Sequence, residues 1–229
     1  RKQLTILEGE PGSGKSYLLL NHALRLVKKS KCLFQFKCKI PVYLDLRNLN
    51  RSEFDQRRNI SASFIEDLVI RSLNPTQDSK WDETIRKAFN FGSWLIIFDS
   101  FDEISEILQS SPQEKIIRDY VNAIRLFLNK RNNFKGVISS RKYEGPMLSG
   151  WRELKITPLN TKQKNNFMIA SGIPVAESNS LLIDLEHSDE LRRISNNPLF
   201  LSILCNNIKQ SGNLDAKSDK LFSKPVRLP

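Results

Sequence analysis

The segment Gly9–Ser16, with the sequence GEPGSGKS, has the residue types and the spacing of a phosphate-binding loop, G-x-x-x-x-G-K-[ST]. Its glycines permit backbone turns that other residues avoid and let N–H groups approach an anion closely. Lys15 would reach the β- and γ-phosphates of a nucleotide, and the Ser16 hydroxyl would ligate Mg²⁺. The predicted nucleotide-binding residues of this segment are Gly9, Glu10, Pro11, Gly12, Ser13, Gly14, Lys15, Ser16 and Tyr17.

Three acidic residues follow the longest apolar run of the chain, Trp94–Phe98. Such a run is typical of a strand in a parallel sheet, and strands of this kind end at the edge of the sheet where ligands bind. Asp99 comes directly after the run, so we expect it to hold Mg²⁺, through water, opposite Ser16. Either Asp102 or Glu103 would then polarise the attacking water as a general base.

Ser139, Ser140 and Arg141 follow another apolar run. At the same sheet edge, the guanidinium of Arg141 would sense the γ-phosphate or stabilise charge in the transition state. A surface arginine after a strand is the alternative interpretation. The predicted catalytic residues are Lys15, Asp99, Asp102, Glu103 and Arg141, and the predicted metal ligands are Ser16 and Asp99.

The elements that must position these groups alternate between strands and helices from residue 4 to residue 157. This alternation predicts a doubly wound α/β fold, the parallel sheet of a P-loop NTPase with helices on both faces. Strands are expected at 4–7, 40–46, 94–98, 136–139 and 154–156, and helices at 15–29, 61–70, 81–89 and 113–129. Ser61 or Ser63 is placed to cap the second of these helices.

After Pro158 only helical patterns remain. Helices are expected at 161–170, 177–185, 190–195 and 199–209, with Thr161 as the cap of the first. The chain is therefore expected to hold a nucleotide-binding domain (1–158), a small all-α subdomain (159–212) and a tail (213–229). The tail is expected to be poorly ordered or to begin a truncated following domain.

Composition places this chain of 229 residues among globular proteins, with 39% hydrophobic and 27% charged residues. No apolar run approaches the length that a membrane span needs. The three cysteines (Cys32, Cys38 and Cys205) and the two histidines show no metal-ligand spacing. A cysteine set this sparse and odd favours a reducing compartment, so a cytoplasmic location is expected. Residue 1 is arginine rather than methionine, so the chain looks excised from a longer protein.

The formal net charge of +11 suits contact with nucleic acid or with an acidic membrane face. The densest basic cluster is Lys28-Lys29-Ser30-Lys31 with Lys37 and Lys39, and Arg51, Arg57 and Arg58 form a second one. We favour a solvated basic face and leave contact with nucleic acid open.

Together these motifs resemble the NACHT branch of the STAND class of signal-transduction ATPases, and its bacterial members most of all. The resemblance rests on the phosphate loop at 9–16, the hydrophobic-Asp-x-hydrophobic-Asp-Glu run at 95–103, the Ser-Ser-Arg at 139–141, and the segments 156–159 and 197–201. It implies that Pro198 packs near the adenine base, that Arg141 is the sensor arginine, and that the helical subdomain is a lid over the nucleotide. Ser100 stands where the family usually has glycine, and the chain ends before the family's winged-helix subdomain.

The leading hypothesis is a nucleotide-driven switch, in which ADP holds a closed monomer and ATP with Mg²⁺ frees the lid and exposes a surface for self-assembly. The resemblance implies ATP rather than GTP, slow hydrolysis, flanking sensor and effector domains, and immune-type signalling such as antiphage defence. The basic charge motivates an alternative, a motor or helper ATPase that acts on nucleic acid. A small-molecule kinase rarely needs the Asp-x-x-Asp-Glu cluster, and binding without hydrolysis ranks lower because the catalytic acids are present.

Overall fold

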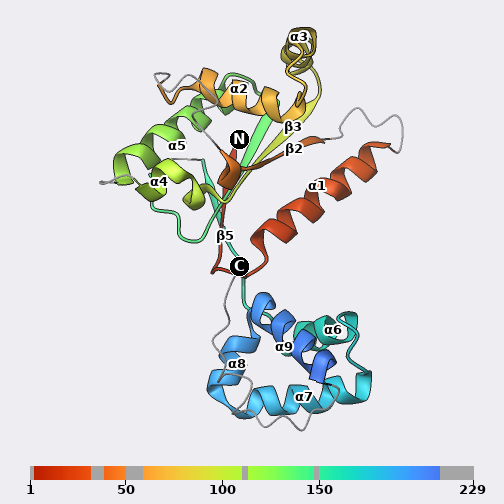
Figure 1. Cartoon of the computed structure of the whole chain (residues 1–229). Helices are drawn as coiled ribbons and strands as arrows, with labels where there is room; N and C mark the ends of the chain where they lie inside the picture. The colour runs from red at the N-terminus through yellow and green to blue at the C-terminus, as the bar shows by residue number, and fades with distance from the viewer. Residues whose placement is uncertain (1–2, 32–38, 50–58, 110–112, 147–149, 212–229) are drawn as a thin grey trace. The chain divides into compact units, whose positions relative to one another are not determined.

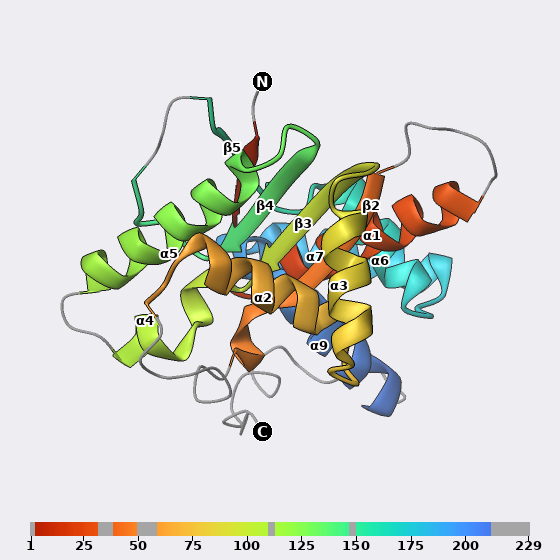
Figure 2. The ribbon, with the colours of Figure 1, turned by 90° about the horizontal axis from the view of Figure 1, so that it is seen from above.

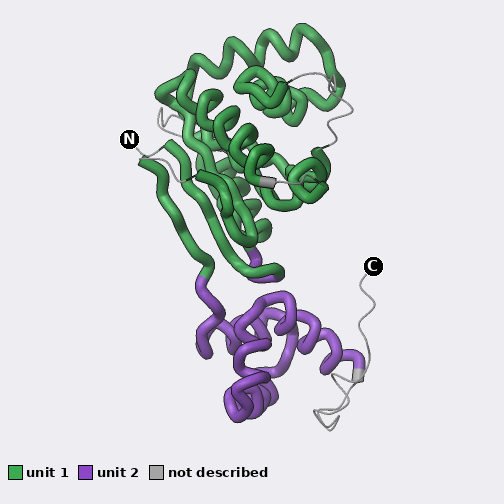
Figure 3. Tube along the Cα trace, turned by 90° about the vertical axis from the view of Figure 1, so that its left-hand side faces the viewer, with its two compact units in different colours: residues 1–11, 15–156 green, residues 12–14, 157–229 purple. Residues whose placement is uncertain are grey.

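The computed structural model describes residues 3–31, 39–49, 59–109, 113–146 and 150–211. The chain divides into two compact units, Arg1–Pro11 with Lys15–Ile156 and Gly12–Gly14 with Thr157–Pro229 (Figure 3). The middle of the phosphate loop thus groups with the helical residues. Some expectations concern residues outside these described ranges: Cys32, Cys38, Lys37, the arginines at 51–58 and the tail at 213–229.

In the described part of the chain, five parallel strands form one sheet in the order β2-β3-β4-β1-β5 (Figures 1 and 2). The strands are β1 (Leu4–Glu8), β2 (Lys39–Asp45), β3 (Ser93–Asp99), β4 (Phe134–Ser140) and β5 (Arg152–Lys155). Because all of them run in the same direction, every strand ends at the same edge of the sheet. The predicted α/β fold is confirmed.

Helices cover both faces of this sheet, and side chains alternate between the two faces along each strand. On one face, Leu95 and Ile97 of β3 belong to a buried cluster with residues of α1 (Lys15–Lys31). Asp99 continues this odd-numbered series and therefore points to the α1 side of the sheet. The even-numbered Phe98 lies in the core on the other face.

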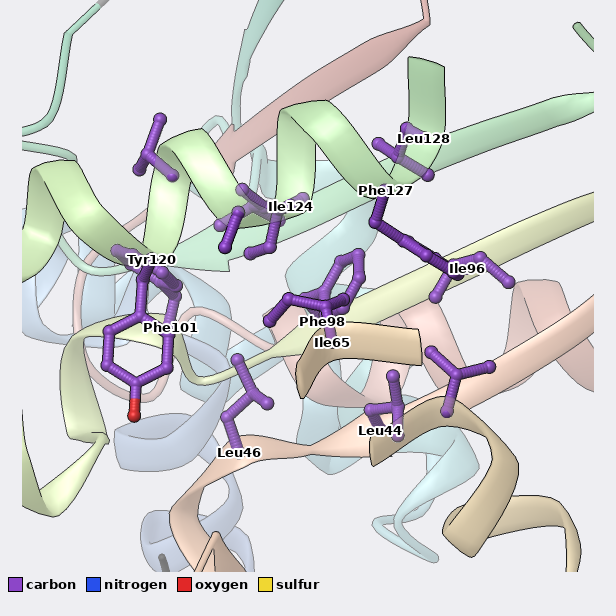
Figure 4. Packing of buried hydrophobic residues seen from close by; sticks show 14 of the residues in the cluster. Leu44, Leu46, Ile65, Ile96, Phe98, Phe101, Tyr120, Ile124, Phe127 and Leu128 are labelled. Atoms are coloured by element: carbon purple, nitrogen blue, oxygen red, sulfur yellow. The ribbon is translucent and has the colours of Figure 1, made fainter. Parts of the chain in front are cut away.

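That second core is rich in aromatic side chains and lies under α2 (Ala62–Leu73) and α5 (Gln113–Asn129) (Figure 4). Phe98 and Phe127 are both fully buried there. Burial of one such side chain contributes about 1.5–3 kcal/mol, so this core fixes β3 and with it the position of Asp99. On the outside, α3 (Ser79–Ala88) contacts α2, and the unpredicted short α4 (Ser105–Gln109) contacts α5.

Side chains cap the N-termini of α2, α3, α6 (Thr161–Ala170) and α8 (Asp189–Ser195). Of the two serines proposed for α2, Ser61 is the cap, because its hydroxyl accepts the N–H of Phe64 at 3.3 Å. The prediction that Thr161 caps the first helix after Pro158 is wrong. Asn160 is the cap, and its side chain and that of Gln163 each accept the other's backbone N–H, at 2.9 and 3.0 Å. This reciprocal pair satisfies two donors at once, which a Thr161 cap would not do.

Four helices make up the described part of the helical unit: α6 (Thr161–Ala170), α7 (Val175–His187), α8 (Asp189–Ser195) and α9 (Pro198–Ser211). Their core includes Met168 and Leu201. Lys164 is only 1% exposed, and its ammonium lies 3.0 Å from Glu186 and 3.4 Å from the carbonyl oxygen of Arg192. A buried charge is tolerated only with such partners, so Lys164 ties α6 to α7 and α8. Within the described residues, no helix is both long enough and apolar enough to cross a membrane.

Candidate functional site

The predicted catalytic residues come together at the carboxyl edge of the sheet. The phosphate loop follows β1, Asp99 ends β3, and Arg141 follows β4, which lies between those two strands. Burial lowers the pKa of Lys15, and the nearby carboxylates of Asp102, Asp99 and Glu103 oppose this shift, whereas Arg141 adds to it. These five charged groups therefore share one electrostatic field within the first unit.

The phosphate loop turns through Gly12 and Gly14, whose φ angles of +73° and +88° favour glycine. Helix α1 begins directly after them, and the first four N–H groups of a helix have no partner within it. The first turn of α1 has no acidic residue, so an anion can occupy the positive end of the helix dipole. The Lys15 ammonium donates to the carbonyl oxygens of Gly9 at 2.6 Å and Glu10 at 3.1 Å, and therefore lies along the loop.

Ser13 supplies an observation that fits a phosphate ligand. Its Oγ is buried without a hydrogen-bond partner among the described residues, and an unpaired buried hydroxyl is unfavourable. A phosphate oxygen would accept this hydroxyl.

The donor set also fits Mg²⁺, because the Ser16 hydroxyl and the Asp99 carboxylate are hard oxygen ligands. Over the parts of the chain that the structure describes, no group of three His, Cys, Asp or Glu residues is suited to a metal. Mg²⁺ would therefore take most of its ligands from phosphates and water.

Asp99 is fully buried, and hydroxyl groups bind both of its oxygens. Tyr43 Oη donates to Oδ2 at 2.5 Å, and Ser139 Oγ donates to Oδ1. A carboxylate has about four lone-pair sites, so these two bonds leave Asp99 able to accept from a metal-bound water. This arrangement fits the water-mediated contact that the sequence predicts.

Ser100 explains how the chain turns away from β3. Its φ of 58° and ψ of 46° lie in the left-handed region, which costs a residue other than glycine about 1–2 kcal/mol. This is the position at which the family resemblance expects glycine. The Ser100 N–H donates to Ser139 Oγ at 2.9 Å, and its carbonyl accepts the Glu103 N–H at 3.0 Å, so hydrogen bonds offset the strain.

The two acids beyond Asp99 contact Arg141 in different ways. Glu103 Oε1 accepts a hydrogen bond from the guanidinium at 2.8 Å. Asp102 Oδ1 accepts the backbone N–H of Arg141 at 3.0 Å, and its Oδ2 lies 3.4 Å from Nε. These side chains are partly exposed, so the ion pairs add little stability, but they place a cation directly beside both candidate bases.

Sequence reasoning missed three polar residues at the end of β2: Tyr43, Asp45 and Arg47. Asp45 lies opposite Asp99 in the strand register. Arg47, in the short helix η1 (Leu46–Asn48), donates to both oxygens of Asp45 at 2.9 and 2.7 Å, and these bonds lower the pKa of the Asp45 carboxyl. The available signal was their position after a parallel strand, which brings them to the same edge as Asp99.

The remaining predicted residues lie at the margins of the loop. Glu10 and Pro11 are exposed, and Tyr17 is 75% exposed on α1. Pro198 is the first residue of α9. The next residue, Leu199, donates its N–H to the Gly12 carbonyl oxygen at 3.3 Å. The role of Pro198 at the adenine base stays a prediction.

Replacing Gly12 with alanine should destabilise the chain more than replacing Gly14. Both substitutions place a Cβ at positive φ, which costs about 1–2 kcal/mol. At Gly12 the new Cβ would also lie 2.7 Å from Leu199 Cβ and 2.8 Å from Asn197 Oδ1, whereas at Gly14 it meets nothing within 4 Å. Thermal unfolding without nucleotide measures the difference. Equal losses in Tm would show that the Asn197–Leu199 segment does not pack on the loop.

The sequence matches a known domain family. A sequence model of the NACHT domain matches residues 3–169. No protein of curated function matches the chain significantly. Among solved structures, the chain is similar to one from the E. coli MS115-1 HORMA:CdnC:Trip13 complex, with 14% sequence identity and a TM-score of 0.46 over 92% of this chain. The match covers 66% of the length of that chain.

Proposed function

Because the chain belongs to the NACHT domain family of P-loop NTPases, we propose that it binds ATP with Mg²⁺, hydrolyses it slowly, and uses the two nucleotide states to switch a larger signalling protein. The observation that best supports this proposal is the Arg141–Glu103 pair beside Lys15 and Asp99 at one sheet edge. A phosphate loop alone indicates that a nucleotide is bound. Acids and an arginine beside it favour cleavage as well.

Each residue has a defined part in the proposed reaction. The loop amides and Lys15 hold the β- and γ-phosphates. Mg²⁺, when bound, neutralises charge on the phosphates, and Ser16 and Asp99 are the residues that would hold it. One of the two acids, Asp102 or Glu103, accepts the proton of the attacking water, and Arg141 stabilises the charge that develops on the γ-phosphate.

A switch of this kind requires ATP and ADP to make different contacts, because only a difference in interaction free energy shifts a conformational equilibrium. The γ-phosphate supplies that difference, since its charge acts on Lys15 and Arg141. The Gly12–Leu199 hydrogen bond suggests how a change in the loop would act on α9. The family further motivates self-association on activation, sensor and effector domains outside this chain, adenine near Pro198, and a role in immune-type or antiphage signalling.

The test combines nucleotide titration, phosphate release and light scattering with ATP, ADP or neither. We expect binding of both nucleotides, slow phosphate release from ATP, and a larger species with ATP in full-length protein given its trigger. A folded chain that ignores nucleotides at millimolar dose would exclude the function. Normal binding without assembly would exclude the switch but not the NTPase. Hydrolysis stimulated by DNA or RNA, with binding that weakens steeply with salt, would instead favour the nucleic-acid alternative.

A further inference from the structure

Tyr43 connects β2 to the acidic end of β3. It pairs with Ile97 in the strand register, so it lies on the α1 face of the sheet, two residues before the position opposite Asp99. Its ring packs against the buried cluster that includes Leu19 and Leu95. From there its hydroxyl reaches Asp99 Oδ2 at 2.5 Å.

Ser139 binds the other oxygen of the same carboxylate from β4, on the opposite side of β3. The position of its Oγ is itself set by the N–H of Ser100 at 2.9 Å. The Asp99 carboxylate is therefore held between hydroxyls from two neighbouring strands. These two hydrogen bonds restrict rotation of the Asp99 carboxylate, and the side chain is buried.

We propose that Tyr43 is a positioning residue for Asp99: its hydroxyl holds the carboxylate in the orientation that a Mg²⁺-bound water requires. The hydroxyls of Tyr43 and Ser139 together form a clamp on the Asp99 carboxylate. This inference rests on the proposed binding of nucleotide with Mg²⁺. Tyr43 acts through Asp99 and touches neither phosphate nor metal.

The competing explanation is that the bond only satisfies a half-buried phenol, since buried tyrosines usually find a partner. Tyr43→Phe separates the two, because it keeps the ring and removes the hydroxyl. Tyr120→Phe is a matched control. Tyr120 is 1% exposed and donates to Glu106 Oε2 at 2.9 Å, in the core on the other face of the sheet.

The readout is the effect of Mg²⁺ on ATP affinity, which needs no hydrolysis. Calorimetric titration in EDTA should give the same Kd for the wild type, Tyr43→Phe and Tyr120→Phe. The Mg²⁺ concentration that produces half of the gain in affinity should rise about tenfold in Tyr43→Phe alone, the size expected for one hydrogen bond to a charged group. An unchanged Mg²⁺ response in Tyr43→Phe, or the same shift in Tyr120→Phe, would overturn the proposal.

A double mutant tests whether Tyr43 acts through Asp99. In an Asp99→Asn background, Tyr43→Phe should cause no further loss of the Mg²⁺ response, whereas independent sites would show additive losses and contradict the inference. Should Tyr43→Phe fail to fold, Ser139→Ala gives the same readout from the other side of the carboxylate. If the wild type binds ATP equally with and without Mg²⁺, both the proposed Mg²⁺-dependent nucleotide binding and the positioning role of Tyr43 are excluded. If the wild type and Tyr43→Phe respond equally to Mg²⁺, only the positioning role of Tyr43 is excluded.

Discussion

Replacing Lys15 with alanine should remove most nucleotide binding and leave the fold intact. Its ammonium lies along the phosphate loop, 2.6 Å from the Gly9 carbonyl oxygen, where it would meet the β- and γ-phosphates. A hydrogen bond to a charged group contributes about 1.5–3 kcal/mol, which corresponds to roughly 10- to 150-fold in Kd. Because one ammonium serves two phosphates, we expect ATP affinity to fall at least about 100-fold in calorimetric titration.

The matched control is Lys28→Ala, which removes an exposed positive charge from the same helix and does not touch the loop. It should bind ATP like the wild type. Burial lowers the pKa of Lys15, so wild-type affinity should fall as pH rises through this lowered value, and Lys15→Ala should lose that part of the pH dependence. A Lys15→Ala variant with wild-type affinity would show that the loop is not the phosphate site.

The main parts of the site could be predicted from sequence because each is a local pattern at the end of a strand. The phosphate loop, Asp99 and Arg141 each follow an apolar run, and the end of a run locates the end of a strand. Once the strands are taken as parallel, geometry brings these ends to one edge. Neither the order of the strands nor any contact distance enters that argument.

The clamp on Asp99 could not be predicted in this way, because it depends on the order β2-β3-β4. That order places Tyr43 and Ser139 on opposite sides of Asp99, and it follows from the packing of whole elements rather than from any local pattern. The bond between Asp45 and Arg47 is local, but its place beside Asp99 depends on the same order. The sequence alone could indicate that β2 ends in polar residues, but not which groups these residues contact.

At two positions, a hydrogen bond to a second residue explains a local conformation that the sequence did not predict. Thr161 and Asn160 are both acceptable caps, and the reciprocal bond with Gln163 selects Asn160. At Ser100, a left-handed turn is expected to use glycine, yet serine is present. The bond from the Ser100 N–H to Ser139 Oγ holds that turn, and Ser139 lies 39 residues away in the chain.

Asp102 and Glu103 remain the two candidates for the general base, and the structure distinguishes them by their partners. Asp102 Oδ1 accepts the backbone N–H of Arg141, so this acid holds the turn after β4. Glu103 contacts the guanidinium of Arg141, a side chain that the γ-phosphate would attract away from it. That movement would also take Nε away from Asp102 Oδ2, but Asp102 would keep its bond to the Arg141 backbone N–H. Glu103 would lose its hydrogen bond to the guanidinium, so it is the better candidate for accepting the proton of water.

Glu103→Gln should therefore lower ATP hydrolysis about 10²–10⁴-fold, because an amide cannot take up the proton, and should leave ATP affinity near the wild-type value. Asp102→Asn should retain most hydrolysis, since its amide oxygen can still accept the Arg141 N–H. Phosphate release at saturating ATP and the Kd for ATP separate the chemical step from binding. Full loss in Asp102→Asn with continued turnover in Glu103→Gln would contradict this assignment. It would identify Asp102 as the base and make Glu103 the partner that holds Arg141.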